Sequence, residues 1–193
     1  MSTAAARSRY TPEEYLALER QTESKNEYID GQIHAMSGAT LPHNLVAGNI
    51  YTRLNIQIWD RPCRAFMGDM RVCVSPTGLY TYPDVTVVCG EPQLLDDHFD
   101  TLLNPTVIVE VLSPSTEAYD RGDKFAHYRR LASLQEYVLV AQNRVHVERY
   151  ARQGKEWLLT EFNQLDDVLR LASIDCEVAL RDVYAKVPFL NTE

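Results

Sequence analysis

Long apolar runs, clustered cysteines and a targeting segment are all lacking in this chain of 193 residues. No apolar run approaches the ~18 residues that cross a bilayer, which excludes a transmembrane helix. The first ten residues, MSTAAARSRY, have no apolar core, so we expect no secretory signal. The four cysteines lie far apart and form no Cys-x-x-Cys pair, which excludes a zinc ribbon or a dense disulfide scaffold. We therefore expect reduced cysteines and a cytoplasmic protein.

Basic residues are also few, with 19 against 27 acidic residues and a formal net charge of -8. Nucleic acid repels an acidic chain at long range, which excludes a histone-like coat of positive charge. A local basic groove is still compatible with the sequence, because arginines cluster at positions 53, 61, 64 and 71 and again at 121, 129 and 130. The alternative is that these arginines are simply solvated.

The composition is that of a globular protein, with 45% hydrophobic and 24% charged residues. No internal repeat, low-complexity tract or linker divides the chain. We expect one domain over residues 1–193, with its core at about residues 10–185.

The first predicted helix begins at Thr11, which can form a capping box with Glu14 around a proline in the first turn. It should run to about Gln21 and bury Tyr15 and Leu18. Asp30-Gly31 between two short alternating runs predicts a hairpin turn. A stripe of apolar residues every four positions predicts a second helix from about Leu41 to Asp60, formed by Val46, Ile50, Leu54 and Ile58.

The centre of the chain holds two short β-branched runs, residues 84–89 and 106–112, each bounded by turn residues. Such runs predict central strands that are buried on both faces. The remaining pattern predicts strands at 64–67, 70–75, 137–140, 144–150, 157–162 and 168–171, a break at 76–78, and helices at 120–131 and 177–184. Strands and helices in this order predict an α/β fold with a mixed central sheet flanked by helices.

Glu110 is the most informative residue, because it interrupts the apolar run Val-Ile-Val-Glu-Val-Leu. A buried carboxylate must be paired, protonated or bound to a metal. Asp84 begins the other central strand and could present its carboxylate at the same end of the sheet. Two converging carboxylates repel each other unless a cation lies between them, and Mg²⁺ or Mn²⁺ suits such oxygen ligands. The alternative is that Asp84 caps a turn and Glu110 pairs with a core arginine.

Lys124 favours the catalytic interpretation, because Asp120, Lys124 and Tyr128 share one helix face at a spacing of four. A lysine near a metal-bound water can stabilise the charge that develops on a phosphate. The alternative is a weak surface pair with Asp120. Glu27 in the hairpin could supply a third carboxylate or be an ordinary charged strand residue. His43 could contact phosphate or be structural.

Together these residues resemble the Uma-two family, a branch of the PD-(D/E)XK nuclease superfamily. The resemblance covers roughly residues 10–185, and its ordered set of motifs is more specific than any one of them. The matching segments are Asn26-Glu27-Tyr28-Ile29-Asp30-Gly31, Met36-Ser37, His43-Asn44, Tyr82-Pro83-Asp84-Val85, Pro105, Val109-Glu110-Val111-Leu112-Ser113-Pro114-Ser115-Thr116, Asp120, Lys124, Tyr128 and Glu136-Tyr137-Val138-Leu139-Val140.

The resemblance implies a restriction-endonuclease-like core with Pro83-Asp84 as the PD element and Glu110 as the second acid. The superfamily pattern places its lysine two residues after the glutamate, where this sequence has Leu112. This family looks like one in which the lysine has migrated to the following helix, here as Lys124. Glu27 would then be the acid contributed by the N-terminal hairpin. Intact residues and a fold do not by themselves establish nuclease activity.

Two functions are therefore expected from the sequence. The first is a Mg²⁺- or Mn²⁺-dependent DNA endonuclease, with catalytic residues Asp84, Glu110, Lys124 and Glu27, a metal held by Asp84, Glu110 and the Val111 carbonyl, and a substrate contact at His43. The second is a non-catalytic nucleic-acid or protein-binding module that retains the nuclease core. A phosphatase is disfavoured by the lack of a phosphate-cradling glycine loop. Double-strand cleavage needs two sites, so we expect a homodimer.

Overall fold

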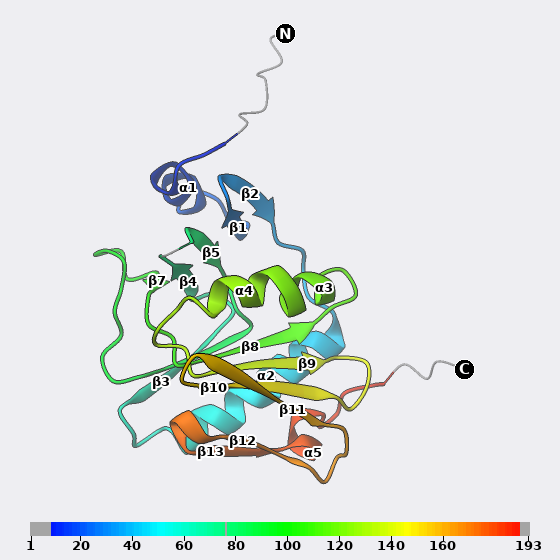
Figure 1. The fold of residues 1–193 in the computed structure, drawn as a ribbon. Coiled ribbons are helices and arrows are strands. Elements are labelled where there is room, and N and C mark those ends of the chain that lie inside the picture. Colours follow the sequence, from blue (N-terminus) through cyan, green and yellow to red (C-terminus); the bar gives the residue numbers. More distant parts are fainter. Residues whose placement is uncertain (1–8, 76, 190–193) are drawn as a thin grey trace.

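The computed structural model describes residues 9–75 and 77–189, so the N-terminal segment and Pro76 of the predicted break lie outside the described residues. The helices are α1 Pro12–Glu19, α2 Leu41–Gln57, α3 Glu117–Tyr119, α4 Phe125–Tyr128 and α5 Leu180–Val183, with a π-helical turn η1 Asp120–Lys124 and a 3-10 turn η2 Ala172–Ile174. The strands are β1 Asn26–Ile29, β2 Gln32–Ala35, β3 Cys63–Met67, β4 Arg71–Val74, β5 Leu79–Thr81, β6 Val85–Cys89, β7 Thr101–Leu102, β8 Val107–Leu112, β9 Glu136–Ala141, β10 Val147–Gln153, β11 Glu156–Phe162, β12 Val168–Leu171 and β13 Cys176–Ala179 (Figure 1).

A six-stranded sheet in the order β11-β10-β9-β8-β6-β3 forms the centre of the molecule. β8 and β9 are parallel, whereas the other neighbours are antiparallel. A second sheet has the order β2-β1-β5-β4-β7, and β12 pairs with β13. The predicted hairpin turn is confirmed, since Asp30 and Gly31 both have positive φ values between β1 and β2. The predicted mixed α/β architecture is therefore present.

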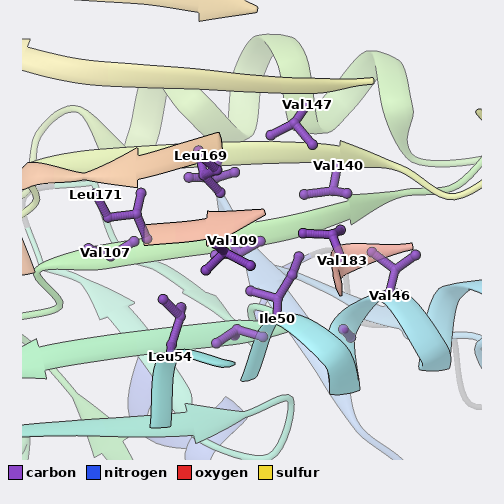
Figure 2. Packing of buried hydrophobic residues seen from close by; sticks show 14 of the residues in the cluster. Val46, Ile50, Leu54, Val107, Val109, Val140, Val147, Leu169, Leu171 and Val183 are labelled. Atoms are coloured by element: carbon purple, nitrogen blue, oxygen red, sulfur yellow. The ribbon is translucent and has the colours of Figure 1, made fainter. Parts of the chain in front are cut away.

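Both faces of the central strands β6 and β8 are buried, as the two β-branched runs predict. On one face, Val46, Ile50 and Leu54 of α2 pack with valines of β6 and β8 (Figure 2). On the other face, Phe125 and Tyr128 of α4 pack with residues of β8 and β9. Alternate residues of β8 belong to the two clusters, and every residue of the strand is buried. This placement leaves Glu110 without access to bulk water through the sheet.

The capping box of α1 is confirmed, but the predicted burial of Leu18 is wrong. Leu18 is 48% exposed, whereas Tyr15, Leu16 and Glu19 are buried. Glu19 takes the inward position because its carboxylate accepts hydrogen bonds from the main chain of Asn26 and from a tyrosine hydroxyl. A satisfied carboxylate thus replaces the expected apolar residue on the inner face.

Two predicted helices differ from the structure. The helix expected at 120–131 begins earlier, at Glu117, and contains the π-helical turn η1. The first part of the helix expected at 177–184 is strand β13, which pairs with β12, and only α5 is helical. The reason is that buried and exposed side chains alternate with the two-residue period of a strand. Cys176 and Val178 are buried, and Glu177 is exposed. The short strands β5 and β7 were not predicted.

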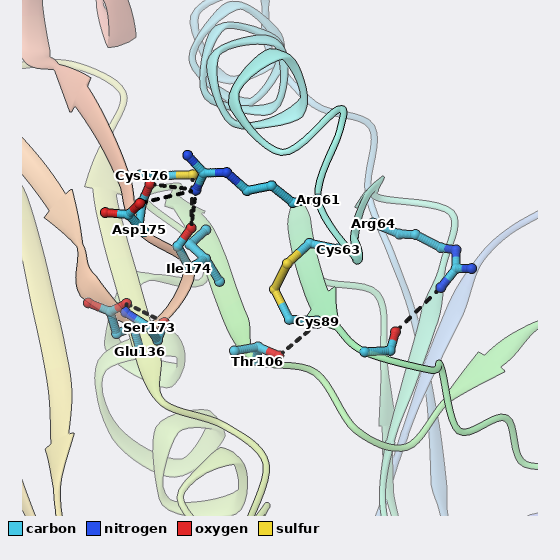
Figure 3. Close-up of a disulfide and its surroundings, with 11 residues drawn as sticks. Arg61, Cys63, Arg64, Cys89, Thr106, Glu136, Ser173, Ile174, Asp175 and Cys176 are labelled. Atoms are coloured by element: carbon cyan, nitrogen blue, oxygen red, sulfur yellow. Dashed lines mark hydrogen bonds and ion pairs between the residues drawn. A yellow bond between two sulfur atoms is a disulfide. The ribbon is translucent and has the colours of Figure 1, made fainter.

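The expectation that all cysteines are reduced is wrong for one pair. Cys63 and Cys89 form a disulfide between β3 and β6, where they are directly opposite in the register (Figure 3). Cys73 and Cys176 are free and buried. The two bonded cysteines are 26 positions apart in sequence, so only the strand pairing brings them together.

Replacing Cys63 and Cys89 together with alanine is expected to lower the free energy of unfolding by roughly 3 kcal/mol, because the unfolded chain gains the entropy of an open loop. Urea denaturation of the oxidised proteins measures this difference, which should shrink strongly when both proteins are reduced. Thiol titration of the denatured, unreduced wild type should find only the two thiols of Cys73 and Cys176. Four titratable thiols would contradict the disulfide.

A group of ion pairs joins the end of α1 to the five-stranded sheet. Asp100 lies 2.8 Å from Arg20 and 2.8 Å from Arg71, whose side chain is only 3% exposed. Arg20 and then Arg71 hold the pKa of Asp100 well below its ordinary value of 3.8.

None of the helices in the described ranges has both the length and the apolar character needed to span a membrane.

Replacing Asp100 with asparagine is expected to lower the free energy of unfolding at pH 7 by roughly 2 kcal/mol, because the Arg71 guanidinium loses a charge-assisted hydrogen bond. A lowered carboxyl pKa stabilises the fold above the unfolded-state pKa, and that contribution disappears as the pH falls towards the folded-state pKa. Urea denaturation should therefore show a smaller difference at about pH 2.5 than at pH 7. The exposed Asp60→Asn variant is the control, and an equal difference at both pH values would contradict the expectation.

Candidate active site

A cavity of about 1100 Å³ opens where the ends of β6, β8 and the first hairpin meet. It is lined by all six residues that the sequence assigns to the site, which are Glu27, His43, Asp84, Glu110, Val111 and Lys124. These residues come from β1, α2, the residue before β6, β8 and η1. Elements that are distant in sequence thus converge on one concave surface.

Asp84 lies beside β8, because Val85 is paired with Val109 in the antiparallel register. Its Oδ2 accepts a hydrogen bond from the main-chain N–H of Val111 at 2.7 Å. The Nε2 of His43 lies 3.3 Å from the same oxygen. Burial alone would lower the pKa of His43, but the hydrogen bond to Asp84, the charge of Asp84 and a hydrogen bond to the Val111 main chain together raise that pKa. His43 therefore lies in the cavity directly beside Asp84.

The Glu110 side chain is almost completely enclosed. Its Oε1 accepts a hydrogen bond from the Tyr128 hydroxyl at 2.9 Å and lies 3.0 Å from the Lys124 ammonium. Burial raises the pKa of Glu110 to about 8, although the Lys124 charge opposes this shift. In this structure the partners of Glu110 are therefore Lys124 and Tyr128, and the expected alternative of a core arginine is wrong.

Lys124 lies among three carboxylates, at 3.0 Å from Glu110, 3.1 Å from Glu27 and 3.4 Å from Asp120. Burial alone would lower the pKa of Lys124, but these carboxylates raise it well above its ordinary value. The side chains of Lys124 and Asp120 are only 7% and 4% exposed, so the alternative of a weak surface pair is wrong. We call these four residues the lysine–carboxylate cluster.

The π-helical turn η1 carries two members of this cluster, Asp120 at its first position and Lys124 at its last. A π turn places one extra residue in the helix and is often found at functional sites. Tyr137 supports the turn by donating a hydrogen bond to the Asp120 carbonyl at 3.0 Å. The alternative that Glu27 is an ordinary strand residue is also wrong, because its carboxylate faces Lys124 and accepts a hydrogen bond from Thr81.

Two residues that contact the lysine–carboxylate cluster were not predicted from the sequence. Thr81 ends the short strand β5 and contacts Glu27, and Tyr119 precedes η1 with its ring 5.8 Å from the Lys124 ammonium. The only available signal was their position, Thr81 just before Tyr82-Pro83-Asp84 and Tyr119 just before Asp120.

The local basic groove that the sequence left open does not form at this cavity, since no arginine is among the described residues that line it. Arg71 is paired with Asp100, and Arg121 is paired with Glu117 and Glu148. Lys25 and Lys124 are the lysines of the cavity wall. Any phosphate contact at this surface therefore depends on few positive charges.

The donor set of the cavity fits a hard divalent cation. In the described part of the chain, no hydrogen bond or ion pair engages Asp84 Oδ1 or Glu110 Oε2. Val111, whose carbonyl the sequence assigns to the metal, also lines the cavity, and its main chain is hydrogen-bonded to His43. Oxygen ligands with room for water are the surroundings that Mg²⁺ and Mn²⁺ prefer. A separate group of His146, Glu148 and Glu161 lies outside this cavity, and Arg121 already neutralises its Glu148.

The sequence model of the Uma2 family, described as "Putative restriction endonuclease", matches residues 12–181. The chain belongs to the Uma2 family. The resemblance inferred from the motifs is thereby confirmed. Two uncharacterized proteins of Synechocystis sp. are similar to this Uma2 chain. One is 39% identical over 83% of this chain and 92% of its own length, and the other is 36% identical over 97% and 98%.

A solved structure shows the same fold as this Uma2 protein. It is the crystal structure of "a putative nuclease belonging to DUF820" from Anabaena variabilis. The TM-score is 0.77 at 21% sequence identity, and the match covers 93% of this chain and 99% of that chain. The restriction-endonuclease-like mixed α/β fold expected from the sequence is thus confirmed, whereas the roles of individual residues rest on the geometry of the cavity.

Proposed function

We propose that this protein is a metal-dependent endonuclease that hydrolyses phosphodiester bonds in DNA. The observation that carries the proposal is the pair of carboxylates, Asp84 and Glu110, at adjacent positions of neighbouring strands with one oxygen of each unengaged. Membership of the Uma2 family supports the same reaction class. An enclosed acidic pair of this kind has little use in a protein that only binds nucleic acid.

Asp84, Glu110 and the Val111 carbonyl would hold Mg²⁺ or Mn²⁺. Such a cation, when bound, lowers the pKa of a coordinated water and neutralises charge on the scissile phosphate. The hydrogen bond from the Val111 N–H fixes the Asp84 carboxylate, and Tyr128 fixes that of Glu110. Both side chains are therefore oriented before substrate arrives, which lowers the cost of reorganisation in the reaction.

Lys124 holds a proton firmly because three carboxylates surround it. Its ammonium would stabilise negative charge that develops on the phosphate or on the attacking oxygen. Glu27 also contacts the Lys124 ammonium and would help to position it. His43 contacts Asp84 and lines the cavity, so it would contact the phosphate or protonate the leaving oxygen.

The alternative, a binding module that retains the nuclease core, is favoured by the net charge of -8 and by the lack of arginine among the described residues of the cavity wall. Such a protein would need the cavity for recognition only. Affinity for DNA would then not depend on a divalent cation. A single assay can separate the two functions because only the nuclease makes a product.

The test is cleavage of single- and double-stranded DNA with Mg²⁺ or Mn²⁺, compared with an excess of chelator. We expect metal-dependent cleavage that falls by about a hundredfold or more in Asp84→Asn, since the substitution removes a charged ligand but can keep the hydrogen bond to Val111. Asp123→Asn is the matched control, because Asp123 is exposed in η1 and is not among the residues that line the cavity. DNA binding without cleavage would overturn the nuclease in favour of the binding module.

A further inference from the structure

β11 leaves one long edge of the central sheet unpaired. It pairs with β10 without a bulge from Val147↔Phe162 to Gln153↔Glu156, and no strand within residues 9–75 and 77–189 pairs with its other side. Its centre is apolar and accessible, with Leu158 48% and Leu159 43% exposed. An exposed, regular and apolar edge strand favours pairing with another strand.

The other edges of the five- and six-stranded sheets lack this combination. β3 carries Arg64 and is covalently tied to β6 through its disulfide. β2 presents Gln32 and His34, and β7 is only two residues long. In β11 the charges stand only near the ends, at Glu156 and Glu161, and no proline interrupts the strand. No central charge, proline or bulge in β11 therefore hinders the pairing of its exposed leucines with another strand.

We propose that a second copy of this chain pairs with β11 in antiparallel orientation, about a two-fold axis at Leu158. The two-residue turn after Gln153 closes the hairpin with a hydrogen-bonded pair, Gln153 and Glu156. Hydrogen-bonded pairs alternate along an antiparallel ladder, so Trp157, Leu159 and Glu161 direct their main-chain groups away from β10. Those groups are the ones that a second β11 can satisfy.

The side chains select this register. With the axis at Leu158, Trp157 of each copy faces Leu159 of the other copy. Lys155 lies in the turn just before β11, next to the end of the second strand that carries Glu161, so the arrangement has two such charge pairs. Opposite charges and apolar pairs directly across two strands stabilise the pairing. With the axis at Leu159, Trp157 would instead face Glu161, and the charge pairs would be lost. The register halfway between these two is excluded. In it, main-chain groups that point away from β10 would face groups of the second copy that point towards its own β10.

The interface leaves the proposed active site open, because no residue of β11 is among those that line its cavity. The dimer would continue the central sheet from one copy into the other. Its existence does not depend on nuclease activity, and it can be tested without DNA or metal.

The register is tested by cysteine substitution and mild oxidation. In Leu158→Cys the two copies face each other at a Cα–Cα distance of about 4.5 Å, which a disulfide can bridge. In Leu159→Cys the Cα atoms of the two cysteines are roughly 8 Å apart, which is too far for a disulfide. We expect a covalent dimer at least about tenfold faster in Leu158→Cys. The wild type is the control, since its free cysteines are buried. Faster cross-linking of Leu159→Cys would overturn the register.

The interface itself is tested by sedimentation of the wild type and of charge variants. Leu158→Lys should dissociate the dimer because two like charges would meet on the axis. Leu18→Lys is the matched control, since Leu18 is also 48% exposed but lies on α1. Lys155→Glu should weaken association about tenfold, and Lys155→Glu combined with Glu161→Lys should restore it. A wild type that stays monomeric up to ~100 μM, or a dimer that Leu158→Lys does not weaken, would overturn the proposal.

Discussion

The Lys124→Ala variant is expected to lose about 3 kcal/mol or more of its free energy of unfolding, because three enclosed carboxylates would face one another without a cation. Glu27, Glu110 and Asp120 all lie within 3.4 Å of the ammonium that the substitution removes. Urea denaturation in the presence of a metal chelator measures the loss. Lys25→Ala is the matched control, since Lys25 also lines the cavity but is 44% exposed.

The loss should also depend on pH. Burial holds the pKa of Glu110 at about 8 in the folded protein, above its ordinary value of 4.5. The folded state therefore binds a proton that the unfolded state does not bind between those pH values, and stability falls as the pH rises through that window. Removing Lys124, whose charge opposes the raised pKa, should raise the pKa of Glu110 further and extend the fall to higher pH. A Lys124→Ala loss that is the same at pH 5 and pH 8, or no loss at all, would contradict this account of the lysine–carboxylate cluster.

The sequence predicted the members of the site better than their surroundings. Glu110 was identifiable because a carboxylate inside an apolar strand must have a partner, and Asp84 because it begins the neighbouring apolar run. Lys124 was identifiable from its spacing to Asp120. The partner of Glu110, however, is set by a helix that packs across the strand, so a core arginine and Lys124 were equally compatible with the sequence.

The remaining differences arise from pairing between distant segments. Cys63 and Cys89 meet only because β3 and β6 are neighbours in register, and Glu27 reaches Lys124 only because β1 is held beside β5. A local pattern carries no information on such neighbours. The π-helical turn η1 has the same cause, since an apolar period cannot show where an extra residue is inserted in a helix.

Unlike Lys124→Ala, the Glu110→Gln variant is expected to keep or increase its free energy of unfolding. In the absence of metal, an amide at this position stays neutral even above pH 8, where Glu110 would bury a negative charge, and it can still accept the hydrogen bond from Tyr128. Lys124 would keep two carboxylate partners, Glu27 and Asp120. The free energy of unfolding should therefore stay unchanged or rise, although the same substitution should abolish cleavage.

Divalent metal separates the two variants further. A cation that binds only the folded protein stabilises it by about 2.7 kcal/mol when its concentration is a hundred times its Kd. Calorimetry should show such a shift with Mg²⁺ or Mn²⁺ in the wild type and none in Glu110→Gln. Glu117→Gln is the control, because Glu117 pairs with Arg121 and is not among the residues that line the cavity. A metal-dependent shift that survives in Glu110→Gln would place the cation elsewhere, and its absence from the wild type would remove the basis for a metal-dependent reaction.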